Sequence, residues 1–218
     1  EELASQLRDE FGIDADVMSA DRADPDAPQA LYDETVARDF EIDTLINNAG
    51  SAGPDLLTTR DWQVQKAHLD LMMTSYAALC HFFVPAMQER GYGRVLNVAS
   101  VAGQMTVPGD MNYGPTKTYL IALSRALSAT VKEDGVHVLA LCPGFTHTDF
   151  HQSKRLSTMK AGTPGFIWYD ADVVVREGLA ALEKGKAVYT SGRLYRFAMP
   201  IIRQPWMRGL LKGFRIRN

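Results

Sequence analysis

The sequence predicts an α/β protein whose core is a doubly wound parallel sheet flanked by helices on both faces. The chain has 218 residues, of which 46% are hydrophobic, so it can bury a sizeable core. Helix-like and strand-like segments alternate along it, and the strand-like runs at 42–47 and 136–142 are apolar almost throughout. Strands of this continuous apolar character are buried on both faces, as in parallel sheets covered by helices.

The first quarter of the chain predicts helix, strand, helix and strand in that order. Apolar residues recur every four positions from residue 3 to residue 11, and Gly12 then ends the helix. The remaining predicted elements here are a short strand over 13–20, a turn over 21–28, a helix entered through Pro28 and continuing over 30–39, and a strand over 42–47.

The rest of the chain continues this alternation. A long helix is predicted over 59–90, with a kink at Pro85, because the segment is rich in Leu, Met, Ala and aromatic residues. After it we expect a strand over 94–99, a helix over 112–134, a strand over 136–142, a helix over 171–184 with Asp170 as its N-cap, and a strand over 186–190. Residues 145–169 have few periodic signals and predict a mobile flap.

Composition and charge narrow the class of protein. The formal net charge is −3 and no window approaches 18 uncharged apolar residues, so we expect a cytoplasmic protein with no nucleic-acid partner. Cys80 and Cys142 lack the partners of a zinc site or a disulfide framework, so we expect buried thiols and no bound metal. No linker or repeat divides the chain, which predicts one domain over 1–190 followed by a tail over 191–218.

The predicted tail is both basic and apolar. Seven Arg or Lys residues and no acidic residue occur between 191 and 218, whereas the first 190 residues carry 16 basic and 26 acidic residues. Basic amphipathic segments lie on anionic membranes, so one interpretation is a peripheral membrane contact. The alternative is a tail that packs over its own substrate cleft or over a partner subunit. Pro200 and Pro205 predict that no single helix spans the tail.

Tyr113, Lys117 and Ser100 are the candidate catalytic residues. In a helix over 112–134, residues four apart share one face, so the Lys117 ammonium can lie beside the Tyr113 phenol. A free phenol has a pKa of about 10, and a nearby cation stabilises its phenolate, so such a pair can transfer protons. The Ser100 hydroxyl would hold a carbonyl oxygen. Taken alone the pair is weak evidence, since a half-buried tyrosine beside a solvated lysine is the ordinary interpretation.

Three further motifs support a site at the carboxyl edge of the sheet. Residues 47–50 (Asn-Asn-Ala-Gly) end one predicted strand, residues 97–100 (Asn-Val-Ala-Ser) end the next, and residues 143–144 (Pro-Gly) end the one after. Open α/β sheets bind their ligands at the carboxyl ends of parallel strands. The three motifs therefore place Ser100 and its neighbours where a ligand would bind.

With these motifs the chain resembles the short-chain dehydrogenase/reductase family, which has a Rossmann-like sheet, over residues 1–190. The resemblance implies an oxidoreductase dependent on NAD or NADP, in which Tyr113 is the general acid/base, Lys117 lowers its pKa and holds the nicotinamide ribose, and Ser100 hydrogen-bonds the substrate oxygen. The implied cofactor-binding residues are Asp21 at the adenine, Asn47, Ala49 and Gly50 along the adenosine and ribose, Tyr113 and Lys117 themselves, and Pro143, Gly144, Phe145, Thr146 and Thr148 at the nicotinamide side.

Several of the residues in these motifs have structural alternatives. Asn48 and Asn97 can brace loops and neighbouring strands instead of touching a ligand. Gly50 and Gly144 can serve only to permit tight turns, and Asp21 can be a turn or cap residue.

The chain departs from the family pattern in two places. The family's first βαβ unit, whose Thr-Gly-x-x-x-Gly-x-Gly turn presents N–H groups to the pyrophosphate, is lacking from the sequence. Because its loss would leave the strands at 13–20 and 42–47 unpaired, we expect about 40 further residues upstream in the natural protein. Secondly, Met72 stands where the family has an asparagine that links the lysine to solvent. A thioether cannot donate a hydrogen bond, which puts the resupply of protons in doubt.

The resulting prediction is an enzyme that interconverts an alcohol and a ketone on a lipophilic substrate. Apolar residues of 145–169 and of the tail favour such a substrate, and the tail resembles those of a reductase branch with long-chain 3-oxoacyl and hydroxysteroid enzymes. The alternative is a non-catalytic binding or scaffold protein that keeps the fold. By the same resemblance we expect a homo-oligomer, a dimer or tetramer, associated through 59–90 and 112–134.

Overall fold

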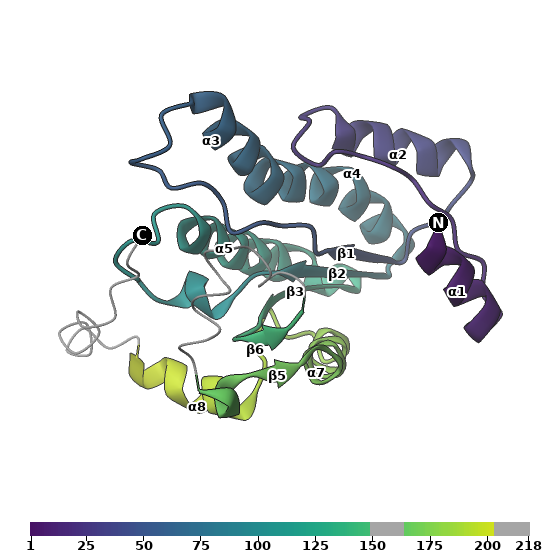
Figure 1. Cartoon of the computed structure of the whole chain (residues 1–218). Coiled ribbons are helices and arrows are strands. Elements are labelled where there is room, and N and C mark those ends of the chain that lie inside the picture. The colour runs from purple at the N-terminus through teal and green to yellow at the C-terminus, as the bar shows by residue number, and fades with distance from the viewer. Residues whose placement is uncertain (149–163, 203–218) are drawn as a thin grey trace.

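The computed structural model describes residues 1–148 and 164–202, and its centre is a parallel sheet of four strands (Figure 1). The strands lie in the order β1 (Thr44–Asn47), β2 (Gly93–Val98), β3 (Val136–Cys142) and β6 (Val188–Thr190). Every neighbouring pair is parallel, and each crossover between them contains a helix. The predicted α/β class is confirmed.

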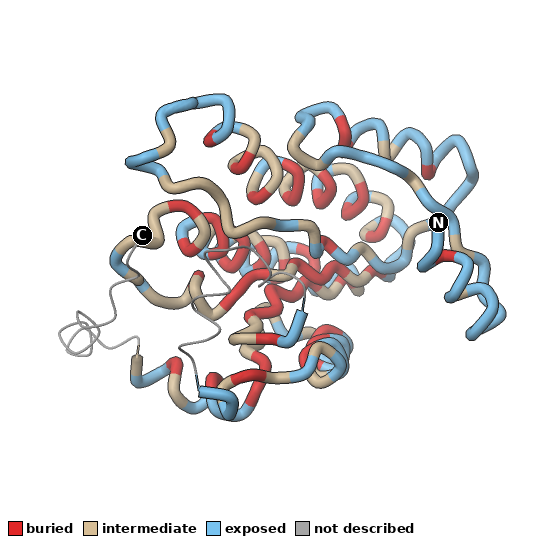
Figure 2. The backbone as a smooth tube through the Cα atoms, in the orientation of Figure 1, coloured by how far each residue is buried: buried red, intermediate tan, exposed pale blue. Residues whose placement is uncertain are grey.

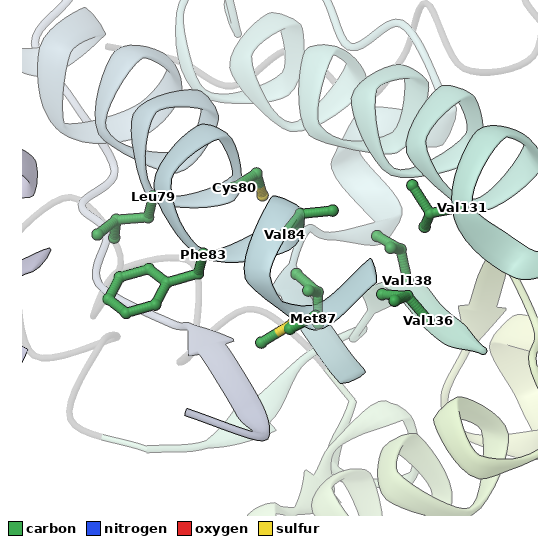
Figure 3. Close-up of a cluster of buried hydrophobic side chains, with 9 residues drawn as sticks. Leu79, Cys80, Phe83, Val84, Met87, Val131, Val136 and Val138 are labelled. Atoms are coloured by element: carbon green, nitrogen blue, oxygen red, sulfur yellow. The ribbon is translucent and has the colours of Figure 1, made fainter. Parts of the chain in front are cut away.

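Helices cover both faces of the sheet, as predicted. α4 (Ser75–Arg90) and α5 (Tyr113–Val131) pack on one face, and α7 (Ala171–Glu183) packs on the other. Buried side chains of α4, α5, β2 and β3 fill the first core: Leu79, Cys80, Phe83, Val84, Met87, Val95, Val131, Val136 and Val138 (Figure 3). The second core joins α7 to Leu96, Leu139 and Leu141. Successive residues of β2 and β3 point into different cores, which explains why both sequences are continuously apolar.

A ladder of buried polar side chains links β1, β2 and α5. The Asn47 side-chain amide donates to the Asn97 side-chain oxygen at 2.9 Å, and the Asn97 side-chain amide donates to the Ser124 hydroxyl at 2.9 Å. All three residues are fully buried, so these bonds form in a low dielectric and fix how the strands meet the helix. Asn97 therefore braces neighbouring elements, which is the structural alternative stated for it above.

The N-terminal segment differs from the prediction. α1 (Glu2–Phe11) ends at Gly12 with φ 63°, as the sequence indicates. The strand predicted over 13–20 is wrong: this stretch forms no strand and is mostly exposed (Figure 2). Ile13 and Val17 are among its exposed residues. A strand needs a neighbour for its backbone hydrogen bonds, and in the described residues β1 ends the sheet without a partner from 13–20. α2 (Ala27–Ala37) follows, with proline in its first turn as expected.

The long helix predicted over 59–90 is divided into three parts. α3 (Trp62–Leu69) leads into the π-helical turn η1 (Asp70–Thr74), and α4 completes the stretch with Pro85 inside it. Met72, in the π-helical turn, is fully buried. Such turns change the direction of side chains and recur at functional sites. The stretch is long and apolar enough to cross a membrane, but the buried side chains of α4 pack against the sheet, as in the core helix of a globular protein.

The other predicted elements are present with small shifts in their ends. α5 continues into the 3₁₀ turn η3 (Lys132–Asp134), β3 has the predicted bounds, and α7 begins after its N-cap residue Asp170. Of the predicted flap, residues 149–163 lie outside the described residues. Its ends form the short parallel pair β4 (Thr146–His147) and β5 (Tyr169–Asp170), the latter preceded by the 3₁₀ turn η5 (Gly165–Ile167). Both cysteines are buried free thiols, as expected.

The described part of the tail forms α8 (Arg193–Ile202), which packs on the body of the protein. Pro200 lies inside this helix, in its last turn, where only one backbone hydrogen bond is lost, and the prediction that no single helix spans 191–218 stays a prediction. Tyr195 and Met199 are buried. Leu194, Phe197 and Ile201 are exposed on the same helix. Residues from 203 onward, including Pro205, lie outside the described residues.

Candidate active site

Ser100 and Tyr113 meet at the carboxyl edge of the sheet. Ser100 follows β2 and opens the 3₁₀ turn η2 (Val101–Gln104), where its hydroxyl accepts a hydrogen bond from Ala102 N at 3.1 Å. Tyr113 is the first residue of α5, and its phenol is hydrogen-bonded to the Ser100 side chain. Two of the three predicted catalytic residues are therefore in direct contact.

Lys117 lies one helical turn after Tyr113 and is only 3% exposed. Its ammonium donates to the Val98 carbonyl oxygen at 2.6 Å. It also lies 5.7 Å from the ring centroids of both Tyr76 and Tyr113, within the range of cation–π attraction. A buried charge needs such partners, and they hold this one at a fixed place beneath the phenol.

Burial sets the proton affinities of this pair. It raises the pKa of Tyr113 to about 12, although the hydrogen bond with Ser100 acts in the opposite direction. Burial also lowers the pKa of Lys117 to about 8. The lowered Tyr113 pKa that was expected from Lys117 is not observed, because desolvation of the phenolate dominates. At neutral pH Tyr113 is therefore protonated and is suited to donate a proton.

The start of α5 is fixed by polar contacts that the sequence patterns did not reveal. Both carboxylate oxygens of Asp110 accept from Gly114 N at 3.0 Å. The Asn112 amide donates to the Gln65 side-chain oxygen at 2.6 Å and to the Pro54 carbonyl oxygen at 3.1 Å. An acidic residue before a helix is a recognised capping signal, so Asp110 could have been found. The contact of Asn112 with Gln65 spans 47 residues and has no local signature.

A small pocket opens beside Tyr113, between the segments 52–56 and 109–113. It is lined by Ala52, Pro54, Asp55, Leu56, Gly109, Asp110, Met111, Asn112 and Tyr113. The lining combines apolar side chains with polar groups near the phenol. In this structure the pocket has room for little more than a water molecule beside Tyr113.

Met72 lies against the turn that follows β1. Its sulfur accepts a hydrogen bond from Ser51 N at 3.3 Å. A Cβ added at Gly50 would lie 3.2 Å from this sulfur and 3.7 Å from the Lys117 ammonium, so the thioether and the lysine border the same small space. The position at which an asparagine was expected is thus filled by a side chain that has no donor.

His68 is a further polar residue near the site that sequence reasoning missed. Its Nδ1 lies 3.3 Å from the Ser51 hydroxyl, and its ring packs on Gly53, where a Cβ would come within 2.5 Å of the ring. Burial lowers the pKa of His68, the Lys117 charge lowers it further, and Asp110 opposes both. Because Gly53 has no side chain, the His68 ring can pack against its backbone. The two residues are 15 positions apart, and no sequence pattern indicates such a contact.

The residues expected along the adenosine and ribose path have differing surroundings. Gly50 lies next to the buried lysine, and the Ala49 carbonyl oxygen accepts from the hydroxyl of a tyrosine on α4 at 2.7 Å. Asn47 belongs to the buried ladder. Asp21 is exposed, and its carboxylate accepts from Ala23 N at 2.9 Å. Asp21 thus serves as a turn residue, which is the alternative stated for it.

The residues expected at the nicotinamide side form the turn after β3: Pro143, Gly144, Phe145, Thr146 and Thr148. The Pro143 carbonyl oxygen accepts from Val101 N at 2.9 Å, which brings this turn next to Ser100. The Thr146 hydroxyl donates to the Gly144 carbonyl oxygen at 3.1 Å, whereas Thr148 is exposed. The structure therefore joins the start of this turn to the loop that carries Ser100, one of the candidate catalytic residues.

Comparison with known proteins identifies the family. A model of the short chain dehydrogenase family matches residues 1–158. The chain belongs to this family. The 3-oxoacyl-[acyl-carrier-protein] reductase FabG of Staphylococcus aureus is 27% identical over 184 residues, which cover 84% of this chain and 75% of that protein. Acetoacetyl-CoA reductase of Cupriavidus necator is 32% identical over 148 residues, or 66% of this chain and 59% of that protein.

Solved structures lead to the same family. A short-chain dehydrogenase from Sphingobium yanoikuyae in complex with NADPH is 26% identical, with a TM-score of 0.80 over 97% of this chain and 80% of that one. The dehydrogenase described here is therefore an oxidoreductase that acts on CH–OH groups with NAD or NADP.

The nicotinamide and ribose part of this cofactor fits the residues present. The Lys117 ammonium can donate three hydrogen bonds, and Val98 accepts one of them, so it has donors for ribose hydroxyl groups beside Tyr113. Gly50 leaves room there, since any Cβ would approach the ammonium to 3.7 Å. For the pyrophosphate, the sequence contains no Thr-Gly-x-x-x-Gly-x-Gly turn, and we assign no residue to that part.

Proposed function

We propose that the dehydrogenase interconverts an alcohol and a ketone on a lipophilic molecule, with Tyr113 as the general acid/base. The observation that carries this proposal is the contact of Tyr113 with Ser100 next to a buried lysine. A carbonyl oxygen bound between the two hydroxyl groups would accept a hydrogen bond from each. Fixed donors of this kind stabilise the negative charge that develops on the oxygen during reduction.

In the reductive direction Tyr113 donates its proton to the substrate oxygen, and Ser100 holds that oxygen by a hydrogen bond. Bound NADH or NADPH supplies the hydride. The phenolate that remains on Tyr113 is stabilised by the Lys117 ammonium, whose attraction is strengthened by the low dielectric of its buried position. A pKa of about 12 keeps the phenol protonated before the reaction.

For the cofactor, we assign Gly50, Lys117 and Tyr113 to the ribose and residues 143–146 to the nicotinamide side. Pro143 supports the second assignment, because its hydrogen bond to Val101 N brings the turn against the serine loop. Thr148, Ala49, Asn47 and Asp21 complete the proposed set. Asn47 and Asp21 also have the structural contacts described above, so we expect them to contribute less to cofactor binding.

A lipophilic substrate is supported by the aromatic side chains near the turn after β3. Phe145 and His147 stack on Trp168 with centroid distances of 5.1 and 5.3 Å. Phe166, in the neighbouring 3₁₀ turn, is 75% exposed. The FabG relative is named a 3-oxoacyl reductase, and the acyl chain of such a substrate is apolar. These surroundings favour an apolar group next to the reacting carbonyl.

The rival proposal, a non-catalytic binding protein, does not account for Lys117. Burial of a charged ammonium costs stability, and a scaffold would gain more from an apolar residue of the same size. Titration of the full chain with NADH and with NADPH, followed by fluorescence, separates the two. Binding of either nucleotide favours the enzyme, whereas binding of neither overturns the proposed function.

The role of Tyr113 is tested by Tyr113→Phe, with Tyr92→Phe as the matched control. Tyr92 is 44% exposed on the loop before β2, and its ring contacts Arg94. We expect Tyr113→Phe to lower kcat for an apolar ketone at least about 100-fold, because the general acid is removed. Nucleotide binding should weaken much less than kcat falls, because Lys117 still holds the ribose, and the control should match the wild type. Wild-type turnover by Tyr113→Phe would exclude the proposed acid.

We also propose that residues 1–190 form the catalytic domain of a cytoplasmic homo-oligomer, a dimer or tetramer, and that the tail over 191–218 touches anionic membranes. Support comes from α8, where Leu194, Phe197 and Ile201 are exposed together with Arg193. Co-sedimentation with vesicles that contain anionic lipid, at low and high salt, tests the membrane contact, and absence of binding at low salt would remove it. Light scattering after gel filtration gives the number of subunits.

A further inference from the structure

Tyr195 of α8 lies directly on the turn after β3. Its ring occupies the space that a side chain at Gly144 would need, since a Cβ there would come within 2.0 Å of the ring. The residue is buried, with 8% exposure, although it belongs to the segment that sequence patterns assign to the tail. Gly144 does not have a positive φ, and the side chain that it lacks leaves the space for this ring.

The Tyr195 hydroxyl joins two segments across this contact. It accepts a hydrogen bond from Phe145 N at 3.2 Å and donates one to the Ile167 carbonyl oxygen at 2.9 Å. Burial raises the pKa of Tyr195, so the hydroxyl stays protonated and can donate at neutral pH. The Tyr195 side chain thus contacts the backbone of this turn twice: its ring packs on Gly144, and its hydroxyl accepts the hydrogen bond from Phe145 N.

The same turn is tied to the catalytic residues on its other side. The Pro143 carbonyl oxygen accepts from Val101 N, and the neighbouring Ser100 hydroxyl is bonded to Tyr113. A short series of contacts therefore leads from α8 through Gly144 to the reacting groups. A shift of the turn would move the residues that we assign to the nicotinamide side.

Tyr169 provides a comparison within the same helix contact. Its hydroxyl accepts from Leu194 N at 3.1 Å, and its ring packs on Gly192, where a Cβ would lie 2.7 Å from it. Both tyrosines therefore attach α8 to the body by a ring on a glycine and by a hydroxyl on the backbone. The hydrogen bonds of Tyr195 differ in that one of them reaches Phe145 in the turn after β3.

We propose that Tyr195 is a positioning residue of the active site: it sets the backbone of Gly144 and Phe145 so that this turn can receive the nicotinamide end of the cofactor. This inference rests on the proposed function. It makes α8 part of the active site, since the C-terminal segment supplies a contact that shapes the cofactor side. The effect of Tyr195 is indirect, through the turn, and it takes no part in proton transfer.

The experiment compares Tyr195→Phe with Tyr169→Phe in the full chain. Each variant loses one hydroxyl that attaches α8, so both should lower the melting temperature by similar amounts. Hydrogen exchange read by mass spectrometry on a peptide that contains Phe145 should become faster in Tyr195→Phe alone, without any cofactor present. Dissociation constants for NADH and NADPH should rise roughly three- to tenfold in Tyr195→Phe, the size of one lost hydrogen bond, and stay within about twofold in Tyr169→Phe.

Two results would overturn the inference. The first is unchanged exchange at Phe145 in Tyr195→Phe, which would show that the hydroxyl does not hold the turn. The second is equal weakening of nucleotide binding in both variants, which would show that α8 matters only for stability. If the wild type binds neither nucleotide, the proposed function fails, and the exchange measurement by itself still decides whether Tyr195 fixes the turn.

Discussion

Replacing Lys117 with methionine tests whether this buried ammonium is retained for catalysis although it destabilises the fold. Methionine has a similar length, keeps the packing against the rings of Tyr76 and Tyr113, and removes the charge. We expect Lys117→Met to fold and to lose most of its turnover, because the phenolate on Tyr113 is no longer stabilised.

The magnitude follows from the pKa of Lys117, which is about 8 in the folded protein against its ordinary value of 10.5. A difference of this size corresponds to about 3 kcal/mol that opposes folding while the lysine is charged in both states. Between these two pKa values the unfolded chain keeps the proton that the folded protein releases, so stability rises with pH in this window. From pH 7 to pH 9.5 the gain is about 2 kcal/mol.

The assay is urea denaturation of the wild type, Lys117→Met and the control Lys184→Met at pH 7 and pH 9.5. Lys184 is exposed at the end of α7, so its loss should leave the pH dependence unchanged. Other groups that titrate in this range are shared by all three proteins and cancel in the comparison. Lys117→Met should lack the gain of about 2 kcal/mol that the other two proteins show between the two pH values.

The change in the free energy of unfolding between pH 7 and pH 9.5 is more informative than the absolute stability of Lys117→Met. Removing the ammonium also leaves the Val98 carbonyl oxygen without this donor, which costs about 1–3 kcal/mol and partly offsets the relief of the charge. That cost is the same at both pH values. Parallel pH dependence in the wild type and Lys117→Met would refute the reasoning, because it would show that the lysine is as well solvated in the fold as in the unfolded chain.

Three further substitutions test other parts of the site. Ser100→Ala should lower kcat about 100-fold and leave nucleotide binding nearly unchanged, as measured by initial rates and fluorescence titration; an equal loss in both would place the hydroxyl at the cofactor instead. Gly144→Ala puts a methyl group about 2.0 Å from the Tyr195 ring and should lower the free energy of unfolding by about 1–3 kcal/mol in urea; wild-type stability would contradict that contact. Met72→Asn adds a donor beside Lys117 and should raise kcat, because proton return then has a route to solvent; an unchanged or lower kcat would count against this relay.

The proximity of the candidate catalytic residues could be predicted from sequence because their geometry is local. Residues four apart on a helix share a face in any α-helix, so Tyr113 and Lys117 are brought together by spacing alone. Ser100 comes directly after the strand that is predicted over 94–99. The run at 136–142 has the same bounds in the structure, since a strand buried on both faces has an unmistakable composition.

The features that could not be predicted depend on partners distant in sequence. Residues 13–20 have a strand-like pattern, but a strand exists only where another one pairs with it. The π-helical turn at 70–74 and the packing of the His68 ring on Gly53 both depend on how separate segments pack together. Pro200 remains in α8 because buried side chains of that helix hold it to the body, a contribution that backbone propensity does not contain.

Three hydrogen bonds join α5 to β2 and to the residues that follow it, and together they position the candidate proton-transfer site. The Asn97 side-chain amide donates to the Ser124 hydroxyl, and the Lys117 ammonium donates to the Val98 carbonyl oxygen. The Ser100 side chain is hydrogen-bonded to the Tyr113 phenol. As the strand advances toward its carboxyl end, its partners move back toward the start of the helix. Positions 113, 117 and 124 are four and seven residues apart, so all three partners lie on one stripe of α5.

This alignment links the fold to the chemistry. A parallel sheet requires the crossover helix to run opposite to its strands, which places the start of α5 at the carboxyl edge where β2 ends. The buried polar ladder then sets the depth of the helix along the strand, and the Tyr113 phenol arrives at Ser100 as a consequence. A rotation of α5 by one residue would break all three contacts together, so the Tyr-x-x-x-Lys spacing is meaningful only with the polar residue that follows seven positions later.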